Sequence, residues 1–203
     1  MAVRAEMTAA RAKLAKLSPV GYFLGLHIRF AAPLIQIQTY SPAWIEHYGS
    51  NAYALRDPTI AWGFSAVGQV RWSELPIPDP FGIMRDAAEF GMPYGLTVSF
   101  GPINSRTISS FAHPMREFTD DEIVTISAIV RRLHEITEPP ESLTKAQQEA
   151  LRCIAEGDRH AAAAAKLGIT ESAFKARLIS ARERLMARTT AEALQRARDY
   201  RLL

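Results

Sequence analysis

The sequence predicts an α+β fold in which a sheet covered by helices is followed by a small all-α domain. Apolar and β-branched residues alternate in two stretches, 22–39 and 95–112, as expected of strands. From residue 144 onward the apolar pattern is purely helical. The paired prolines of TEPPES, residues 137–142, separate the two regions because they cannot continue a helix. We therefore expect domains over 1–137 and 144–203, joined by a linker over 138–143.

The first predicted elements are a helix and two strands. Charged residues interrupt every apolar run in residues 1–18, which favours an amphipathic helix over a signal peptide. Residues 22–39 predict two strands on either side of a break at Pro33. Ser41 and Pro42 then suit the N-cap and first turn of a helix over 41–56, because Trp44, Ile45 and Tyr48 recur at helical spacing.

The second part of this region continues with a helix, two strands and a long helix. Residues 79–91 predict a helix that ends at Gly91, and residues 95–100 and 107–112 predict two strands joined by a turn. The helix over 118–137 has Thr119 as a candidate cap, acidic residues in its first turn and basic residues toward its end, as the helix dipole favours.

The C-terminal region predicts four helices. Residues 167–170, Leu-Gly-Ile-Thr, form a short glycine turn with Thr170 as the cap of the following helix, which is the spacing of a helix-turn-helix. The four predicted helices span residues 144–156, 159–167, 171–186 and 190–201.

Composition excludes several classes of function. The chain has 48% hydrophobic and 22% charged residues, and its apolar runs are too short to span a membrane. A single cysteine, Cys153, favours a reducing compartment, so we expect a cytoplasmic protein. The five histidines are scattered and no GxSxG motif occurs, so we expect no catalytic residue, no metal site and no cofactor.

The positive charge lies in the C-terminal third. Residues 141–203 hold 12 of the 24 Lys and Arg residues but only 8 of the 21 Asp and Glu residues. This balance indicates a polyanionic partner for this region. The third helix of the region would be the DNA-recognition helix, with basic side chains at Lys175, Arg177, Arg182 and Arg184. The alternative is a helical hairpin with a solvated basic face.

Three motifs of this region, LTKAQQEALRCIAEGD, KLGITESAFKARL and RLMARTTAEAL, resemble the DNA-binding domain of LuxR-type transcription regulators. The resemblance covers 143–203 without a gap and implies a homodimer on a palindromic promoter element, with RNA polymerase as a possible further partner. This chain departs from the family at Ala146-Gln147, Ala173-Phe174 and Arg177. The DNA contacts implied by the resemblance are Thr170, Ser172, Lys175, Ala176, Arg177, Arg182 and Arg188.

The stretch WIEHYGSNAYALRDP, residues 44–58, is similar to the ligand motif of LuxR-type quorum-sensing receptors for N-acyl-homoserine lactones. That motif is a Trp, a Tyr four residues later, and Asp-Pro nine residues further. The resemblance implies an α/β/α sandwich around an antiparallel sheet that encloses the autoinducer. The matching pocket residues are Tyr40, Trp44, Tyr48, Asp57, Pro58, Trp72, Gly95 and Ser110.

The chemistry of these residue types suits such a ligand. Trp44 can donate to the lactone carbonyl, and Tyr40 can donate to the acyl carbonyl. Asp57 can accept from the amide N–H in a charge-assisted bond. Tyr48 and Trp72 would form flat apolar walls, and Ser110 would reach a substituent on the chain. The alternative is that the aromatic residues are ordinary core.

We therefore expect a DNA-binding transcription regulator of quorum sensing that responds to an acyl-homoserine lactone. One alternative is an antiactivator that forms heterodimers with a related regulator and binds DNA poorly. Another is an orphan regulator that senses a different small molecule. In the last helix, Leu194, Ala197 and Tyr200 share a face that would contact either a second protomer or its own domain.

Overall fold

The structure is a computed structural model that describes residues 2–29, 32–138, 142–200 and 202–203. The chain divides into two compact units, residues 1–138 and 139–203. The predicted linker falls largely on residues 139–141, which lie outside the described residues.

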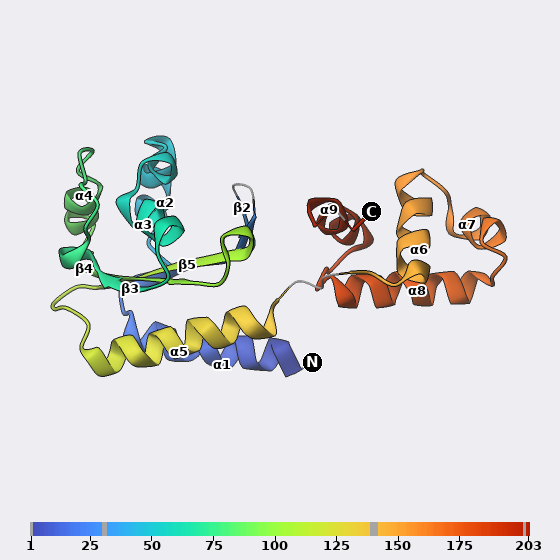
Figure 1. Cartoon of the computed structure of the whole chain (residues 1–203). Coiled ribbons are helices and arrows are strands. Elements are labelled where there is room, and N and C mark those ends of the chain that lie inside the picture. Colours follow the sequence, from blue (N-terminus) through green and yellow to red (C-terminus); the bar gives the residue numbers. More distant parts are fainter. Residues whose placement is uncertain (1, 30–31, 139–141, 201) are drawn as a thin grey trace. The chain divides into compact units, whose positions relative to one another are not determined.

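The N-terminal unit is built on a five-stranded antiparallel sheet with the strand order β2-β1-β5-β4-β3. Figure 1 shows two helices, α1 and α5, against one face and three helices, α2 to α4, against the other. The strands are β1 (Gly21–Arg29), β2 (Ala32–Gln38), β3 (Gly68–Arg71), β4 (Tyr94–Phe100) and β5 (Arg106–His113). The helices are α1 (Ala2–Leu17), α2 (Pro42–Ser50), α3 (Pro58–Ser65), α4 (Ile83–Glu89) and α5 (Asp120–Ile136), with 3-10 turns η1 (Tyr53–Leu55), η2 (Trp72–Glu74) and η3 (Ile103–Ser105).

Successive residues of the central strands alternate between the two faces of the sheet, and the two faces have different side chains. Leu96 and Val98 of β4 and Phe111 of β5 point toward α1 and α5, where they join one buried apolar cluster. The intervening Gly95 and Thr97 belong to the opposite face, because successive strand residues point to opposite sides. The first face is therefore the main core, and the second is left for the aromatic side chains of α2 to α4.

The predicted break at Pro33 is wrong. Strand β1 ends at Arg29 and β2 begins at Ala32, so Pro33 lies inside β2 and pairs with Ile28. Proline is tolerated there because β2 is an edge strand, in which one side of the backbone needs no ladder partner.

The helix predicted from Ser41 begins as expected, with the Ser41 hydroxyl accepting from Trp44 N, but it ends at Ser50. Neither α3 nor β3 is among the elements expected from the sequence.

The predicted cap of the long helix is confirmed. Thr119 and Glu122 form a reciprocal capping box at the start of α5. Both carboxylate oxygens of Glu122 also accept from Arg116, at 2.8 Å each. These bonds lower the pKa of Glu122 to about 2, so the carboxylate supports this helix end down to strongly acidic pH.

A buried histidine pair ties the end of α5 to the sheet. His27 has a left-handed backbone, with φ of 54°, at an irregularity in the β1–β5 register. Its Nε2 lies 3.1 Å from the His134 carbonyl, which only accepts, so Nε2 carries the hydrogen and Nδ1 accepts from Ser105. The His134 ring contacts Thr107 at 2.8 Å, and burial lowers the pKa of His134, which favours the neutral ring.

The C-terminal unit consists of α6 (Lys145–Ala155), α7 (His160–Lys166), α8 (Glu171–Arg184) and α9 (Thr190–Asp199). Gly168, with φ of 66°, makes the turn between α7 and α8, and Thr170 caps α8 by accepting from Ala173 N. In α9, Ala197 and Tyr200 are buried and Leu194 is half-buried, which favours packing within the unit. In the part of the chain that the structure describes, no helix has both the length and the apolar character to cross a bilayer.

Truncation of the central core residue tests the sheet arrangement. Phe111 is fully buried between the sheet and α5, so Phe111→Ala should lower the free energy of unfolding by about 3–5 kcal/mol in urea titration. Leu55 is 87% exposed, and Leu55→Ala should change it by less than about 0.5 kcal/mol. Similar losses for the two variants would contradict this core assignment.

Candidate functional site

An aromatic cluster fills the space between α2, α4 and the sheet. Trp44 is its centre, only 5% exposed, with ring centroids of Tyr48, Tyr53 and Phe90 5.4–6.4 Å away. These rings meet at tilted or edge-on angles, which aromatic quadrupoles favour. Tyr40 and Trp72 belong to the same cluster, together with the apolar residues Ile83, Ala87, Met92 and Ala112.

Asp57 is a buried carboxylate with neutral donors around it. It caps α3, where its Oδ1 accepts from both the backbone N–H and the hydroxyl of Thr59 at 2.7 Å. Its Oδ2 accepts from the Tyr48 hydroxyl, also at 2.7 Å. No Lys or Arg among the described residues forms an ion pair with it. Burial raises the pKa of Asp57 and outweighs the opposing effect of these hydrogen bonds.

The two tyrosines beside Asp57 remain protonated donors. Burial and the Asp57 charge raise the pKa of both Tyr40 and Tyr48. Tyr40 donates to the Ser110 carbonyl at 3.0 Å, which connects the start of α2 to β5. The sequence analysis assigned Tyr48 to a wall of the pocket, but its hydroxyl also supports the Asp57 carboxylate.

Trp72 lies flat over Gly95. A Cβ atom at Gly95 would lie 2.1 Å from the Trp72 ring, so only glycine allows the indole this position. The indole N–H donates to Thr97 Oγ1 at 3.0 Å, and Thr97 Oγ1 lies 3.4 Å from the Ser110 hydroxyl. The structure therefore brings all eight predicted pocket residues into one connected group, with Pro58 buried as the first residue of α3.

Sequence reasoning missed several members of this group. Thr97 has a local signal, because it alternates with Gly95 along β4. Thr59 also has one, because it follows the Asp-Pro helix start. The contact of His47 and Tyr53 with Asp86 has no such signal, since these residues are far apart in the chain.

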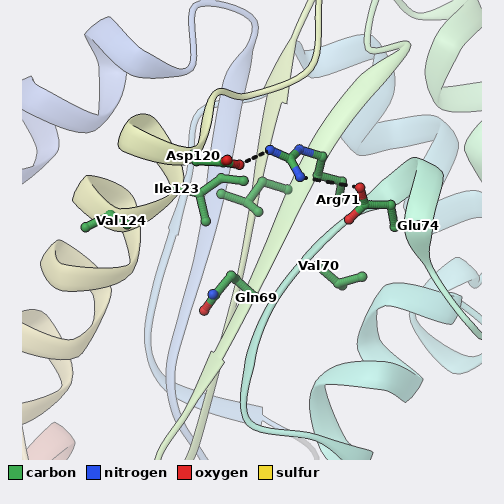
Figure 2. Close-up of a pocket in the computed structure, with 8 residues that line it drawn as sticks. Gln69, Val70, Arg71, Glu74, Asp120, Ile123 and Val124 are labelled. Atoms are coloured by element: carbon green, nitrogen blue, oxygen red, sulfur yellow. Dashed lines mark hydrogen bonds and ion pairs between the residues drawn. The ribbon is translucent and has the colours of Figure 1, made fainter.

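Two cavities lie away from the aromatic cluster. One, of about 270 Å³, lies between β3 and α5 and is shown in Figure 2. Arg71 dominates it, donating to the Phe118 carbonyl and pairing with Asp120 and Glu74. These contacts hold the start of α5 against the sheet edge. The other is a shallow groove along α1 and α5.

The predicted DNA contacts divide into two groups. Ser172, Lys175 and Ala176 are exposed on the first turns of α8, after the cap Thr170, and Arg188 is exposed beyond its end. In contrast, Arg177 is half-buried and pairs with Glu149 at 3.4 Å. Arg182 is also half-buried, and its Nε has no partner among the described residues.

Two departures from the expected motif have structural roles. Gln147 completes a capping box with Thr144 at the start of α6 and also donates to the Ser180 hydroxyl of α8. Phe174 lies on the buried side of α8 and is fully enclosed. Both residues therefore stabilise the unit itself.

A family model described as the autoinducer binding domain matches residues 13–136, which include the whole aromatic cluster. The chain belongs to this family. Membership in the autoinducer binding family agrees with the LuxR-type resemblance of the N-terminal unit. It also supports the expectation that the chain is a receptor and not an enzyme.

Known proteins resemble between 64% and 98% of the chain. Transcriptional activator protein RaiR of Rhizobium etli is 27% identical, in a match that covers 80% of this chain and 74% of RaiR. A crystal structure of Escherichia coli SdiA superposes with a TM-score of 0.56 at 19% identity, covering 98% of this chain and 91% of SdiA. The N-acylhomoserine lactone dependent LuxR family factor CepR2 of Burkholderia cenocepacia gives a TM-score of 0.51 at 21% identity, over 64% of this chain and 80% of CepR2. The two structures share this fold.

The contact between Trp72 and Gly95 can be tested by adding a single methyl group at residue 95. Gly95→Ala should displace the indole, break its bond to Thr97 and lower the free energy of unfolding by about 1–3 kcal/mol. Tryptophan emission should shift to longer wavelength as the ring becomes solvated. A Cβ at Gly49 in α2 meets open space, so Gly49→Ala should stabilise the autoinducer binding domain by about 0.5–1 kcal/mol. Equal effects of the two substitutions would contradict this packing.

Proposed function

We propose that the chain is a transcription regulator of quorum sensing that binds an N-acyl-homoserine lactone in the aromatic cluster and DNA through α8. The observation that carries the proposal is the buried Asp57 carboxylate, which lies beside Tyr40 and Tyr48 with only neutral donors around it. An ionised carboxylate in such surroundings gains from another donor. The amide N–H of an acyl-homoserine lactone supplies one.

The other polar groups suit the remaining atoms of this ligand. Among the described residues, no acceptor contacts the Trp44 indole N–H, which leaves it available for the lactone carbonyl. The Tyr40 hydroxyl donates to a backbone carbonyl and can transfer that bond to the acyl carbonyl. Thr97 and Ser110 lie side by side on β4 and β5, where they can recognise an oxygen substituent on the chain. The ligand of CepR2 is of this chemical class.

For DNA, the exposed start of α8 is the surface we propose to enter the major groove. Thr170, Ser172, Lys175 and Ala176 are accessible there, and Arg188 is placed to contact the backbone. We propose that two protomers bind a palindromic promoter element and that the regulator works in the cytoplasm with RNA polymerase. The activator RaiR supports the assignment to transcription.

Specific observations favour two alternatives. Arg177 and Arg182 are partly withdrawn into the unit, as expected if the chain binds DNA poorly and acts as an antiactivator in heterodimers. A second SdiA structure, with a TM-score of 0.55 over 98% of this chain and 88% of that chain, is a complex with octanoyl-rac-glycerol. Such an acylglycerol is the natural test compound for an orphan regulator with a different ligand.

The ligand proposal is tested by Asp57→Asn. With a panel of acyl-homoserine lactones and octanoyl-rac-glycerol, wild type should be stabilised by about 2.7 kcal/mol when the ligand reaches a hundredfold excess over Kd. Loss of the charge-assisted bond to the ligand should weaken binding about 10- to 100-fold in Asp57→Asn. Thermal shift and isothermal titration measure both. Stabilisation by octanoyl-rac-glycerol alone would establish the orphan alternative.

The same substitution should spare the unliganded protein. Because burial raises the folded-state pKa of Asp57, its ionisation costs stability as pH rises from its ordinary value of 3.8 through the raised value. Asp57→Asn removes that cost, so its stability relative to wild type should increase over this pH range. If the variant loses apo stability as severely as it loses ligand affinity, Asp57 belongs to the core and the ligand proposal fails.

The DNA proposal is tested at Lys175. This side chain is exposed and pairs only with Glu171 of its own helix, so its ammonium is available to a phosphate. Lys175→Ala should weaken binding to the promoter next to the protein's own gene and reduce the salt dependence of log K by about one per lost contact. Arg152→Ala, at an exposed position of α6, is the matched control and should leave affinity unchanged. Absence of specific retention by the wild-type homodimer in gel shifts would favour the antiactivator.

A further inference from the structure

Helix α4 is set between two glycines with positive φ. Gly82 precedes it with φ of 69°, and Gly91 follows it with φ of 85°. A Cβ atom at Gly91 would meet open space, and one at Gly82 would meet only the end of the flexible Arg85 side chain. Tight packing therefore does not explain these glycines, whereas the left-handed backbone does. Both ends of α4 are positions at which the chain can swivel.

The inner side of α4 covers the aromatic cluster. Ile83 and Ala87 are buried against it, and Phe90 at the helix end lies 5.4 Å from the Trp44 ring. The polar groups beneath are enclosed, since Tyr40, Trp44 and Asp57 are each less than 9% exposed. A small molecule reaches them only if a covering element moves.

The polar attachment of α4 to the rest of the unit is concentrated on one atom. Asp86 Oδ2 accepts from the Tyr53 hydroxyl at 2.5 Å and contacts His47 Nε2 at 3.2 Å. Within the described part of the chain, every other hydrogen bond or ion pair of residues 82–91 stays within the local segment 79–92. The bonds from Tyr53 and His47 lower the pKa of Asp86, so the carboxylate is ionised near neutral pH.

The other covering helices are attached more firmly. Gly63 of α3 packs directly on Ile108 of β5, and its carbonyl accepts from the Ser99 hydroxyl at 2.6 Å. α2 is attached by the bond from the Tyr48 hydroxyl to Asp57 at the start of α3, and by the Tyr40 bond to β5 immediately before the helix. Among the described residues, α4 is the one helix of the three whose polar contacts with the rest of the unit all meet at a single side-chain atom, and it is flanked on both sides by glycines with positive φ.

We propose that α4 is the gate of the aromatic site and that Asp86, through His47 and Tyr53, is the positioning residue that holds it shut. Release of Asp86 lets α4 turn about Gly82 and Gly91 and withdraws Phe90 from Trp44. The His47 ring stacks on Trp44 and lies tilted against Phe90, with centroids 5.9 and 5.0 Å away, so the contact that holds Asp86 is coupled to the ring cluster. The identity of the entering molecule rests on the proposed function, but the motion of α4 does not.

Hydrogen–deuterium exchange on the ligand-free full chain tests the gate. In wild type, the amides of α4 should exchange faster than those of α3, because opening of α4 precedes unfolding of the sheet. Asp86→Asn should accelerate exchange of α4 roughly five- to tenfold and leave α3 unchanged. Tyr53→Phe, which removes one bond only, should give a smaller increase. Glu89→Gln is the matched control, because it removes the same charge from an exposed position of the same helix and should have no effect.

Two results would overturn the gate. One is protection of α4 equal to that of α3 in wild type, and the other is an increase in Asp86→Asn that spreads evenly over both helices. Stopped-flow tryptophan fluorescence with N-octanoyl-homoserine lactone then separates the gate from the ligand assignment. If the lactone binds, Asp86→Asn should raise its association and dissociation rates together with little change in Kd. If it binds to no variant while the exchange pattern holds, the ligand assignment fails and the gate stands.

Discussion

Much of the N-terminal unit is arranged around the burial of one carboxylate, Asp57. Removing an ionised group from water is costly unless donors replace the lost solvent. Thr59 supplies two donors through the helix cap, and Tyr48 supplies a third from α2. This explains the spacing of the motif in physical terms. Asp57 follows Tyr48 by nine positions, which lets the end of α2, η1 and the start of α3 fold back on each other. Tyr40 lies close enough to feel the charge of the carboxylate, and Trp44 packs against the Tyr48 ring that donates to it.

The sheet makes this arrangement possible because one of its faces forms the apolar core and the other carries the aromatic and polar groups of the site. One face is closed by α1 and α5 over a continuous apolar core, which supplies the stability. The other face carries glycine and small hydroxyl side chains at Gly95, Thr97 and Ser110, which leave room for aromatic rings and present polar atoms to them. The face covered by α1 and α5 is therefore fixed by the main core, and the proposed gate, α4, lies on the opposite face.

Sequence reasoning succeeded where the determining interaction is local. The Ser41 and Thr119 caps, the Gly168 turn with its Thr170 cap and the β4–β5 pair each depend on residues a few positions apart. It failed at Pro33 because the tolerance of proline depends on β2 being an edge strand, which is a property of the whole sheet. Tyr48 was expected to form a wall of the pocket, whereas it also donates a hydrogen bond to Asp57. A tyrosine suits both roles, so its residue type alone does not distinguish them. The contacts of Asp86 and of the buried His27–His134 pair join segments far apart in the chain, so no local sequence pattern predicts them.

The central claim is that the aromatic cluster holds an acyl-homoserine lactone against Asp57. The most direct measurement is mass spectrometry of small molecules that co-purify with the protein after expression with and without a panel of these lactones. One lactone should be retained intact in stoichiometric amount, and the soluble yield should rise in its presence. Protein that retains no lactone and gains no soluble yield from any member of the panel would contradict the central claim.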